Sequence, residues 1–171
     1  MSIPSSFRKS RLLAPIACVA LALLLGACAS LQPVAPGATR EQAIARHGQP
    51  SDVVALPNAG SRLQYSVQPE GRTAVMVDLD AAGRVVETRQ MLSPAGFARV
   101  VPGQWKREDV FREFGRPKSV DHVYSWNGDI MTYRWLSIDE PMFFWVYVDP
   151  NGVVQKTGVG PDLERFLDFQ R

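Results

Sequence analysis

Residues 36–50 read PGATREQAIARHGQP and residues 102–117 read PGQWKREDVFREFGRP, so one segment occurs twice in the chain. The Pro-Gly pair recurs after 66 positions and the Gly-x-Pro ending after 67. In both copies, residues at positions i, i+1 and i+4 share one face of a helix: Ala43, Ile44 and His47 in the first, and Val110, Phe111 and Phe114 in the second. A glycine follows, and a proline two residues later prevents the helix from continuing. The pattern predicts a helix over residues 39–47, with Thr39 as its N-cap, and a second helix that ends at Gly115.

Apolar residues beyond each helix alternate with a period of two, which is typical of strands. In the first copy they are Leu63, Tyr65, Val67, Val75, Val77 and Leu79. In the second copy they are Met131, Tyr133, Trp135, Phe144, Val146 and Val148. Residues 80–83 and 149–152, which begin with Asp and end with Gly, predict hairpin turns that lead into a last strand. The predicted fold class is therefore α+β, with two tandem repeats, each a short helical layer packed on a three-stranded antiparallel sheet.

The predicted organisation has five parts. They are a signal peptide (1–27), a lipidated tether (28–35), a first repeat (36–92), a linker (93–101) and a second repeat (102–171). The second repeat ends in a predicted closing helix over residues 161–169, with Leu163, Phe166 and Leu167 on its apolar side.

The first 27 residues have the pattern of a secretory leader. Three basic residues precede an apolar run over residues 12–25. This run is too short to span a bilayer, which takes about 20 residues, and small residues follow it. The leader ends in Leu25-Gly26-Ala27-Cys28, which resembles the lipobox of bacterial lipoproteins. The resemblance implies cleavage before Cys28 and lipidation of its sulfur. The alternative is an ordinary cleaved signal in which Cys28 is incidental.

Composition excludes several classes of function. Removing the leader removes three of the 19 Lys and Arg residues and leaves 16 against 17 Asp and Glu, a net charge of −1 that argues against a nucleic-acid partner. Two Cys and two His exclude zinc ribbons and disulfide frameworks, and neither His47 nor His122 has a second ligand at metal spacing. The chain has no nucleophile elbow, phosphate loop or dinucleotide fingerprint, so we expect no enzyme activity, no cofactor and no metal.

These motifs together resemble a known family, the small outer-membrane lipoproteins of the SmpA/OmlA (BamE) type. The resemblance lies in the lipobox, the Pro-Gly before a Thr-x-Glu helix start, the Gly-x-Pro, and a strand ending in Asp-x-x-Gly-x-Val; it covers residues 36–89 and 102–156. It implies acyl chains such as palmitate on Cys28, and Ala29 and Ser30 after it imply sorting to the outer membrane, facing the periplasm. It also implies a role beside the machinery that assembles β-barrel proteins.

The tandem arrangement is similar to the β-lactamase-inhibitor-protein architecture, in which two such units grip another protein. We therefore expect a non-enzymatic, protein-binding accessory in envelope integrity or barrel assembly. The alternative is an inhibitor or modulator of a periplasmic enzyme. A cell-wall hydrolase would need a polar cleft with a perturbed carboxylate, which the sequence does not indicate.

The candidate partner-binding residues lie on one strand of the second repeat. Residues 102–171 hold 13 of the 16 aromatic residues. Phe143, Trp145 and Tyr147 occupy the odd positions of a strand whose even positions match the core of the first repeat. Because Trp and Tyr dominate binding hot spots, this row predicts a contact surface for a protein. The alternative is that the first repeat, the linker or the closing helix buries the row.

Overall fold

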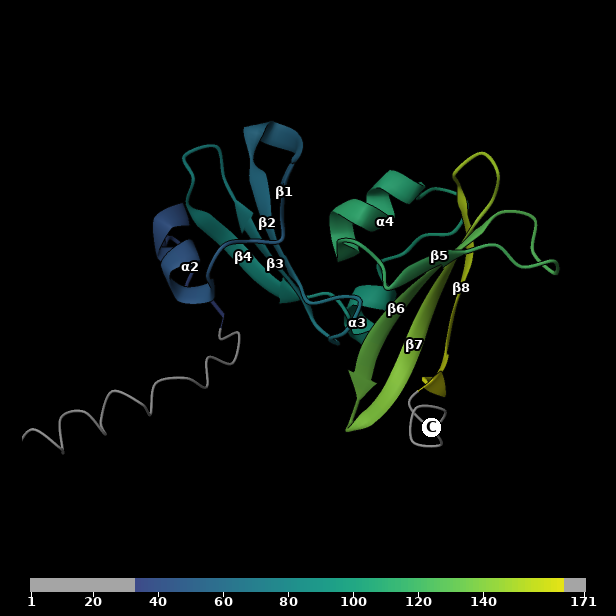
Figure 1. Cartoon of the computed structure of the whole chain (residues 1–171). Helices are drawn as coiled ribbons and strands as arrows, with labels where there is room; N and C mark the ends of the chain where they lie inside the picture. The colour runs from purple at the N-terminus through teal and green to yellow at the C-terminus, as the bar shows by residue number, and fades with distance from the viewer. Residues whose placement is uncertain (1–32, 165–171) are drawn as a thin grey trace, which may run out of the picture. The chain divides into compact units, whose positions relative to one another are not determined.

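The computed structural model describes residues 33–164, which form an α+β fold with two four-stranded antiparallel sheets (Figure 1). Sheet 1 contains β1 (Asp52–Ala55), β2 (Ser61–Ser66), β3 (Ala74–Leu79) and β4 (Val85–Gln90). Sheet 2 contains β5 (Ser119–Asp121), β6 (Asp129–Ser137), β7 (Glu140–Val148) and β8 (Val154–Pro161). The helices are α2 (Arg40–His47), α3 (Pro94–Phe97) and α4 (Arg107–Phe114), with a 3-10 turn at Pro57–Ala59. Both sheets belong to one compact unit.

The two halves have the same element order, but the prediction of three strands per sheet is wrong. A short additional strand, β1 or β5, follows each Gly-x-Pro turn and pairs antiparallel with the next strand. β1 has four residues and β5 has three. Strands of that length contain too little alternation to be distinguished from loop by periodicity. In both sheets each strand pairs with its neighbour in the sequence.

The helix boundaries follow from the capping chemistry that the sequence predicted. The Thr39 hydroxyl accepts the Gln42 N–H at 3.3 Å, and the Gln42 side chain accepts the Thr39 N–H at 2.8 Å. This reciprocal capping box satisfies two backbone groups at the start of α2. In α4 the Asp109 carboxylate accepts the Lys106 N–H at 2.8 Å. Gly115 ends α4 with a φ of 76°, a conformation that favours glycine.

The two predicted hairpin turns are confirmed. Asp80 accepts the N–H groups of Ala82 and Arg84 through one carboxylate oxygen, at 2.9 Å each. Asp149 accepts two N–H groups in the same way, from Asn151 and Val153 at 2.9 Å. Each Asp therefore supplies the acceptors of a tight turn between two long strands.

Sheet 1 is covered on both faces. On one face the ring of His47 in α2 lies 5.2 Å from the ring of Tyr65 in β2. On the other face Ala74 and Met76 of β3 belong to a buried cluster that includes Val110 and Phe114 of α4. The same helix also packs on sheet 2, because the Phe114 ring lies 5.7 Å from Tyr133 and 5.6 Å from Phe144. One helix therefore contributes to the packing of both sheets.

Buried polar groups join sheet 1 to the end of α4. Arg62 is 2% exposed, and its guanidinium binds the Asp78 carboxylate at 2.5 and 2.9 Å and that of Glu113 at 2.8 Å. It also donates to the Arg112 carbonyl at 2.9 Å, and Gln64 donates to the carbonyls of Phe111 and Arg112. Carbonyls in the last turn of a helix lack partners within the helix, so these side chains satisfy groups that burial would leave unpaired.

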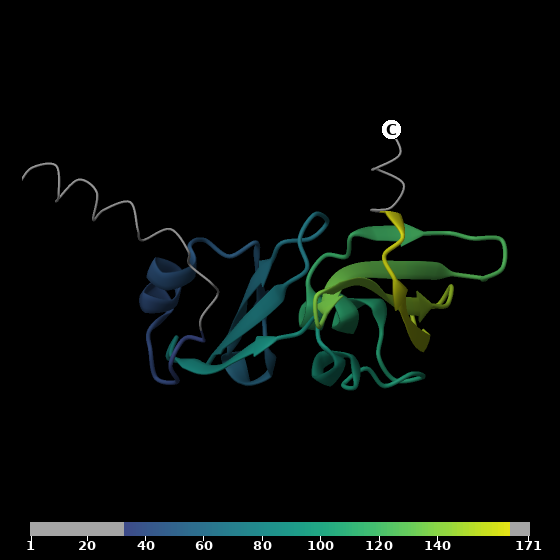
Figure 2. The same cartoon turned by 90° about the horizontal axis from the view of Figure 1, so that it is seen from below.

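The segment predicted as a linker, residues 93–101, also contributes to the core. It contains α3, and the Phe97 ring stacks on Phe144 with centroids 3.9 Å apart and planes at 12°. Phe97 also meets Trp135 edge-on at 5.0 Å. In Figure 2, α3 and α4 lie on the same side of sheet 2. We call this side the inner face of sheet 2 and the opposite side its outer face.

The predicted closing helix begins later than residue 161. Pro161 is the last residue of β8, and Glu164, the last residue that the structure describes, is in helical conformation. The rest of that predicted helix, and the predicted leader and tether up to residue 32, lie outside the described residues.

Candidate functional site

The predicted partner-binding residues lie together on the outer face of sheet 2. Phe143, Trp145 and Tyr147 alternate along β7 with Phe144 and Val146, which are buried in the core on the inner face. Phe143 is 8% exposed, whereas Trp145 and Tyr147 are half-buried. The ring centroids of Phe143 and Trp145 are 5.9 Å apart. We call these three residues the aromatic row.

A lysine lies against each end of the aromatic row. The Lys118 ammonium is 5.7 Å from the centroid of the Phe143 ring. At the other end, the Lys156 ammonium is 4.4 Å from the Tyr147 ring and 5.1 Å from the Trp126 ring. Cations over aromatic faces are attracted by the ring quadrupole. The row is therefore an apolar strip with a lysine at each end, and at the Phe143 end Lys118 is paired with the Glu164 carboxylate at 3.0 Å.

Trp126 extends the aromatic row, and the sequence pattern did not predict it. Its ring meets Tyr147 edge-on at 5.3 Å, and its indole N–H donates to the Val148 carbonyl at 3.2 Å. It comes from the loop between β5 and β6, so it shares no period with the strand residues. The sequence offered one indication of its role: a large apolar side chain in the polar loop Ser-Trp-Asn-Gly needs a packing partner elsewhere in the fold.

Two glycines of β8 make room for Trp145. Gly158 is its partner in the strand pairing, and Gly160 pairs with Phe143. A Cβ atom on Gly160 would lie 2.7 Å from the Trp145 ring, closer than such atoms approach, whereas one on Gly158 would lie at 3.6 Å. The indole therefore lies directly against the β8 backbone, because neither glycine has a side chain between the ring and the strand.

The equivalent faces of the two sheets differ in what covers them. In sheet 1, Ala74 and Met76 lie at the positions that match Phe143 and Trp145, and α4 packs on them. In sheet 2, none of the helices within residues 33–164 packs on the aromatic row, because α3 and α4 both lie on the inner face. The linker therefore does not bury the row. The first half reaches the outer face of sheet 2 at Arg134, which contacts Pro69 and Glu70.

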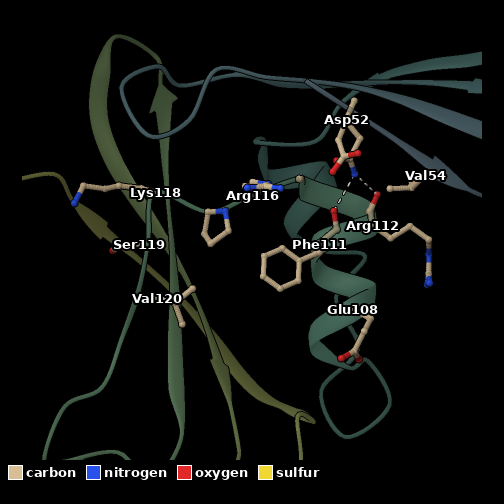
Figure 3. Close-up of a pocket in the computed structure, with 12 residues that line it drawn as sticks. Asp52, Val54, Glu108, Phe111, Arg112, Arg116, Lys118, Ser119 and Val120 are labelled. Carbon is tan, nitrogen blue, oxygen red and sulfur yellow. Dashed lines mark hydrogen bonds between the residues drawn. The ribbon is translucent and has the colours of Figure 1, made fainter. Parts of the chain in front are cut away.

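A cavity lies where α4 passes the edge strands β1 and β5 (Figure 3). The cavity has a volume of about 660 Å³. Its apolar lining residues are Val54, Phe111, Pro117 and Val120. Its charged lining residues are Asp52, Glu108, Arg112, Arg116 and Lys118. The lining therefore mixes apolar and charged side chains.

The histidines are separated in the fold. His47 packs on Tyr65, and burial, with a contribution from Arg46, lowers the pKa of its imidazole. His122 is exposed, and its Nε2 lies 2.6 Å from the Asp129 carboxylate. Within residues 33–164, no three His, Cys, Asp or Glu side chains are grouped so as to hold a metal ion.

Cys28, the predicted lipidation site, lies outside the described residues. Among residues 33–164, no helix has the length and apolar character needed to cross a membrane. No protein-family model, curated protein or solved structure matches this chain.

Proposed function

We propose that this protein is an outer-membrane lipoprotein, anchored through Cys28 on the periplasmic side, that binds a protein partner through the aromatic row. It acts without catalysis, as an accessory in envelope integrity or in the assembly of β-barrel proteins. Its two halves are tandem copies of one unit related to the BamE type. The element order that the halves share supports this duplication, as do the equivalent bridges Thr39–Arg84 and Lys106–Val153.

The outer face of sheet 2 is the observation that carries the binding proposal. On the matching face of sheet 1, α4 covers Ala74 and Met76 of β3. On sheet 2, the row presents half-buried Trp and Tyr side chains between two lysines. Aromatic residues at the centre and charge at the rim are the pattern of a binding hot spot. A partner with an apolar surface and an acidic group opposite Lys156 fits this face.

Crosslinking in intact cells tests the proposal. The variant Trp145→Ser/Tyr147→Ser removes two aromatic anchors, each worth about 2 kcal/mol or more in a hot spot. We expect partner capture to fall by at least about tenfold, while the variant keeps a cooperative unfolding transition. Lys156→Glu, which reverses an exposed charge beside the row, should weaken capture without affecting the core. Val159→Ser is the matched control, because Val159 is an exposed apolar residue on the same sheet that pairs with Phe144.

The identity of the captured protein separates the two candidate roles. Barrel-assembly proteins would support the accessory role, and a periplasmic hydrolase would favour the inhibitor or modulator. Full capture by both row variants would refute the aromatic row as the contact surface. The anchor is tested separately by the intact mass of the protein purified from membranes and by release of Cys28→Ser into the soluble fraction.

A further inference from the structure

The last strand of sheet 2 leaves a long edge open. β8 lies at the margin of the sheet, and β7 is the one strand that it pairs with among the described residues (Figure 1). The start of its other edge is occupied, because the Val154 N–H donates to the Trp105 carbonyl at 2.8 Å and the Val154 carbonyl accepts the Gly103 N–H at 2.7 Å. Pro161, which has no N–H to donate, lies at its end. Residues 155–160 lie between these two limits.

The register of β8 determines which of its backbone groups face outward. The Asp162 N–H donates to the Pro141 carbonyl at 3.0 Å, so the backbone of residue 162 is directed at β7. Successive residues of an antiparallel strand point to opposite edges, and the pairing with β7 continues in register back to residue 156. The N–H and C=O groups of Thr157 and Val159 therefore point away from the sheet.

The other edges of the two sheets are short, capped or covered. β1 has four residues, and the Asp52 carboxylate accepts the Val53 N–H at 2.8 Å. β5 has three residues. On β4, which matches β8, the Thr88 hydroxyl donates to the Val34 carbonyl at 3.3 Å, because the chain before α2 runs along that edge. Proteins commonly shield edge strands in these ways. Within the described part of the chain, residues 155–160 of β8 have no such cover.

The difference between β4 and β8 arises in the segment before each repeated helix. Val100 corresponds to Val34, because the two lie 66 positions apart, the offset of the repeat. Val100 is 8% exposed and belongs to the core against which Phe97 packs. The segment that covers the edge of sheet 1 is therefore packed in the core in the second half, and Thr157, the counterpart of Thr88, stays exposed.

The open stretch is complementary to a second copy of itself. If two β8 strands pair antiparallel about Gly158, Thr157 of each copy faces Val159 of the other. The outward groups of these two pairs form four backbone hydrogen bonds, and their β-branched side chains meet across the strands. Centring the pair on Val159 would set Thr157 against Pro161, which cannot donate. Centring it on Thr157 would set Val159 against Gln155, beside the bulge at the start of the strand.

Charge also permits this pairing. Lys156 is the one charged residue of the stretch 155–160. In the pair centred on Gly158, it faces Gly160 of the second copy rather than the second lysine. The two Lys156 residues lie four strand steps apart, about 14 Å, which exceeds the Debye length of about 8 Å at physiological ionic strength. Because the Trp145 ring lies against Gly160, Lys156 of one copy approaches the aromatic row of the other.

We propose that two copies of this protein form a two-fold symmetric dimer in which their β8 strands pair antiparallel, centred on Gly158. The two-fold axis is perpendicular to the sheet, so both copies of sheet 2 join into one continuous sheet and both aromatic rows lie on the same face. A single strand pair buries less than the about 1,200 Å² of a stable interface, so the dimer is weak and reversible. The dimer depends neither on the lipid anchor nor on the protein that the aromatic row binds.

Oxidative crosslinking of the full chain in membranes tests the register. Opposed residues of a non-hydrogen-bonded antiparallel pair have Cα atoms about 4.5 Å apart, which a disulfide can bridge. Gly158→Cys should therefore crosslink two copies, and its Cβ makes ordinary contact with Trp145 at 3.6 Å. Thr157→Cys is the matched control, because its two copies lie about 8–9 Å apart, too far for a disulfide. The wild type gives the background from Cys18 and Cys28.

Charges at the facing positions test the pairing without a disulfide. Thr157→Lys/Val159→Lys opposes like charges in both facing pairs, so the dissociation constant of the dimer, measured by sedimentation of the full chain in detergent, should rise about tenfold. Thr157→Lys/Val159→Glu opposes lysine to glutamate in both pairs and should restore the dimer. Both side chains are exposed in the single chain, so both variants should keep a cooperative unfolding transition.

Two results would overturn the dimer. One is crosslinking of Gly158→Cys that does not exceed that of Thr157→Cys. The other is an equal dissociation constant for the two charge variants. Failure of the proposed function is a separate result, because partner capture that survives Trp145→Ser/Tyr147→Ser would leave the crosslinking of Gly158→Cys unchanged.

Discussion

His47 shows how burial of one residue links stability to pH. Its ring packs against Tyr65, and its Nε2 is buried without a hydrogen-bond partner among the described residues. Burial disfavours the charged imidazolium, which lowers the pKa of His47 in the folded protein. In the unfolded chain the imidazole has the ordinary histidine pKa, near 6.5. In the folded protein the pKa is lower, so the side chain is still neutral at pH values at which the unfolded chain is already protonated. Folding therefore opposes protonation of this side chain.

We predict that His47→Phe reduces the loss of stability on acidification. In the wild type, the favourable contribution of neutral His47 is present above about pH 6.5 and decreases as the pH falls toward its lowered folded-state pKa. Phe retains an aromatic ring against Tyr65 and carries no titratable group. Urea unfolding between pH 7.5 and pH 5 should show a shallower decline for the variant. Identical pH dependence in both proteins would contradict the prediction.

Gly160 allows the Trp145 ring to pack on the backbone of β8. We predict that Gly160→Ala destabilises the protein by about 1–3 kcal/mol, the usual cost of overpacking, because the new methyl group collides with the Trp145 ring. Gly158→Ala is the control, since its methyl would make ordinary contact at 3.6 Å. Chemical denaturation measures both variants. Equal stability of the two would show that Trp145 does not rest on β8.

Elements with strong local signals were predictable from the sequence. The cap of α2, the glycine that ends α4 and the Asp-capped hairpins each depend on residues within four positions of one another. β1 and β5 escaped detection because they are short edge strands, stabilised by pairing with β2 and β6 rather than by their own pattern. The position of Trp126 beside Tyr147 depends on the path of a loop, which periodicity does not encode.

The buried charges around Arg62 connect the two halves at the scale of the whole molecule. We predict that Arg62→Ala lowers the free energy of unfolding by about 3–5 kcal/mol, because it leaves the buried Glu113 carboxylate without its closest cationic partner. Asp78 keeps its ion pair with Arg89 at 2.7 Å. Arg99→Ala, at an exposed arginine, is the matched control. Urea titration monitored by tryptophan fluorescence measures both. A decrease in the free energy of unfolding of less than about 1 kcal/mol would mean that solvent screens the ion pairs of Arg62.

The way the halves pack could not be obtained from either repeat alone. The alternation in β3 identified one core face, through Val75, Val77 and Leu79, but only the fold shows that α4 covers Ala74 and Met76 on the other face. The sequence likewise placed Phe143, Trp145 and Tyr147 on one face of β7 and left their cover undecided. Contacts between segments distant in sequence decide such questions, and alternation within one strand contains no information about them.

A loop of the first half meets an open edge of the second. Beyond the end of β5, the Gln68 amide accepts the Arg134 N–H at 3.1 Å and donates to the Arg134 carbonyl at 2.8 Å. Exposed backbone edges promote aggregation between molecules. Gln68 therefore satisfies both backbone groups of Arg134, so this part of the β6 edge is not free to pair with a strand of another molecule.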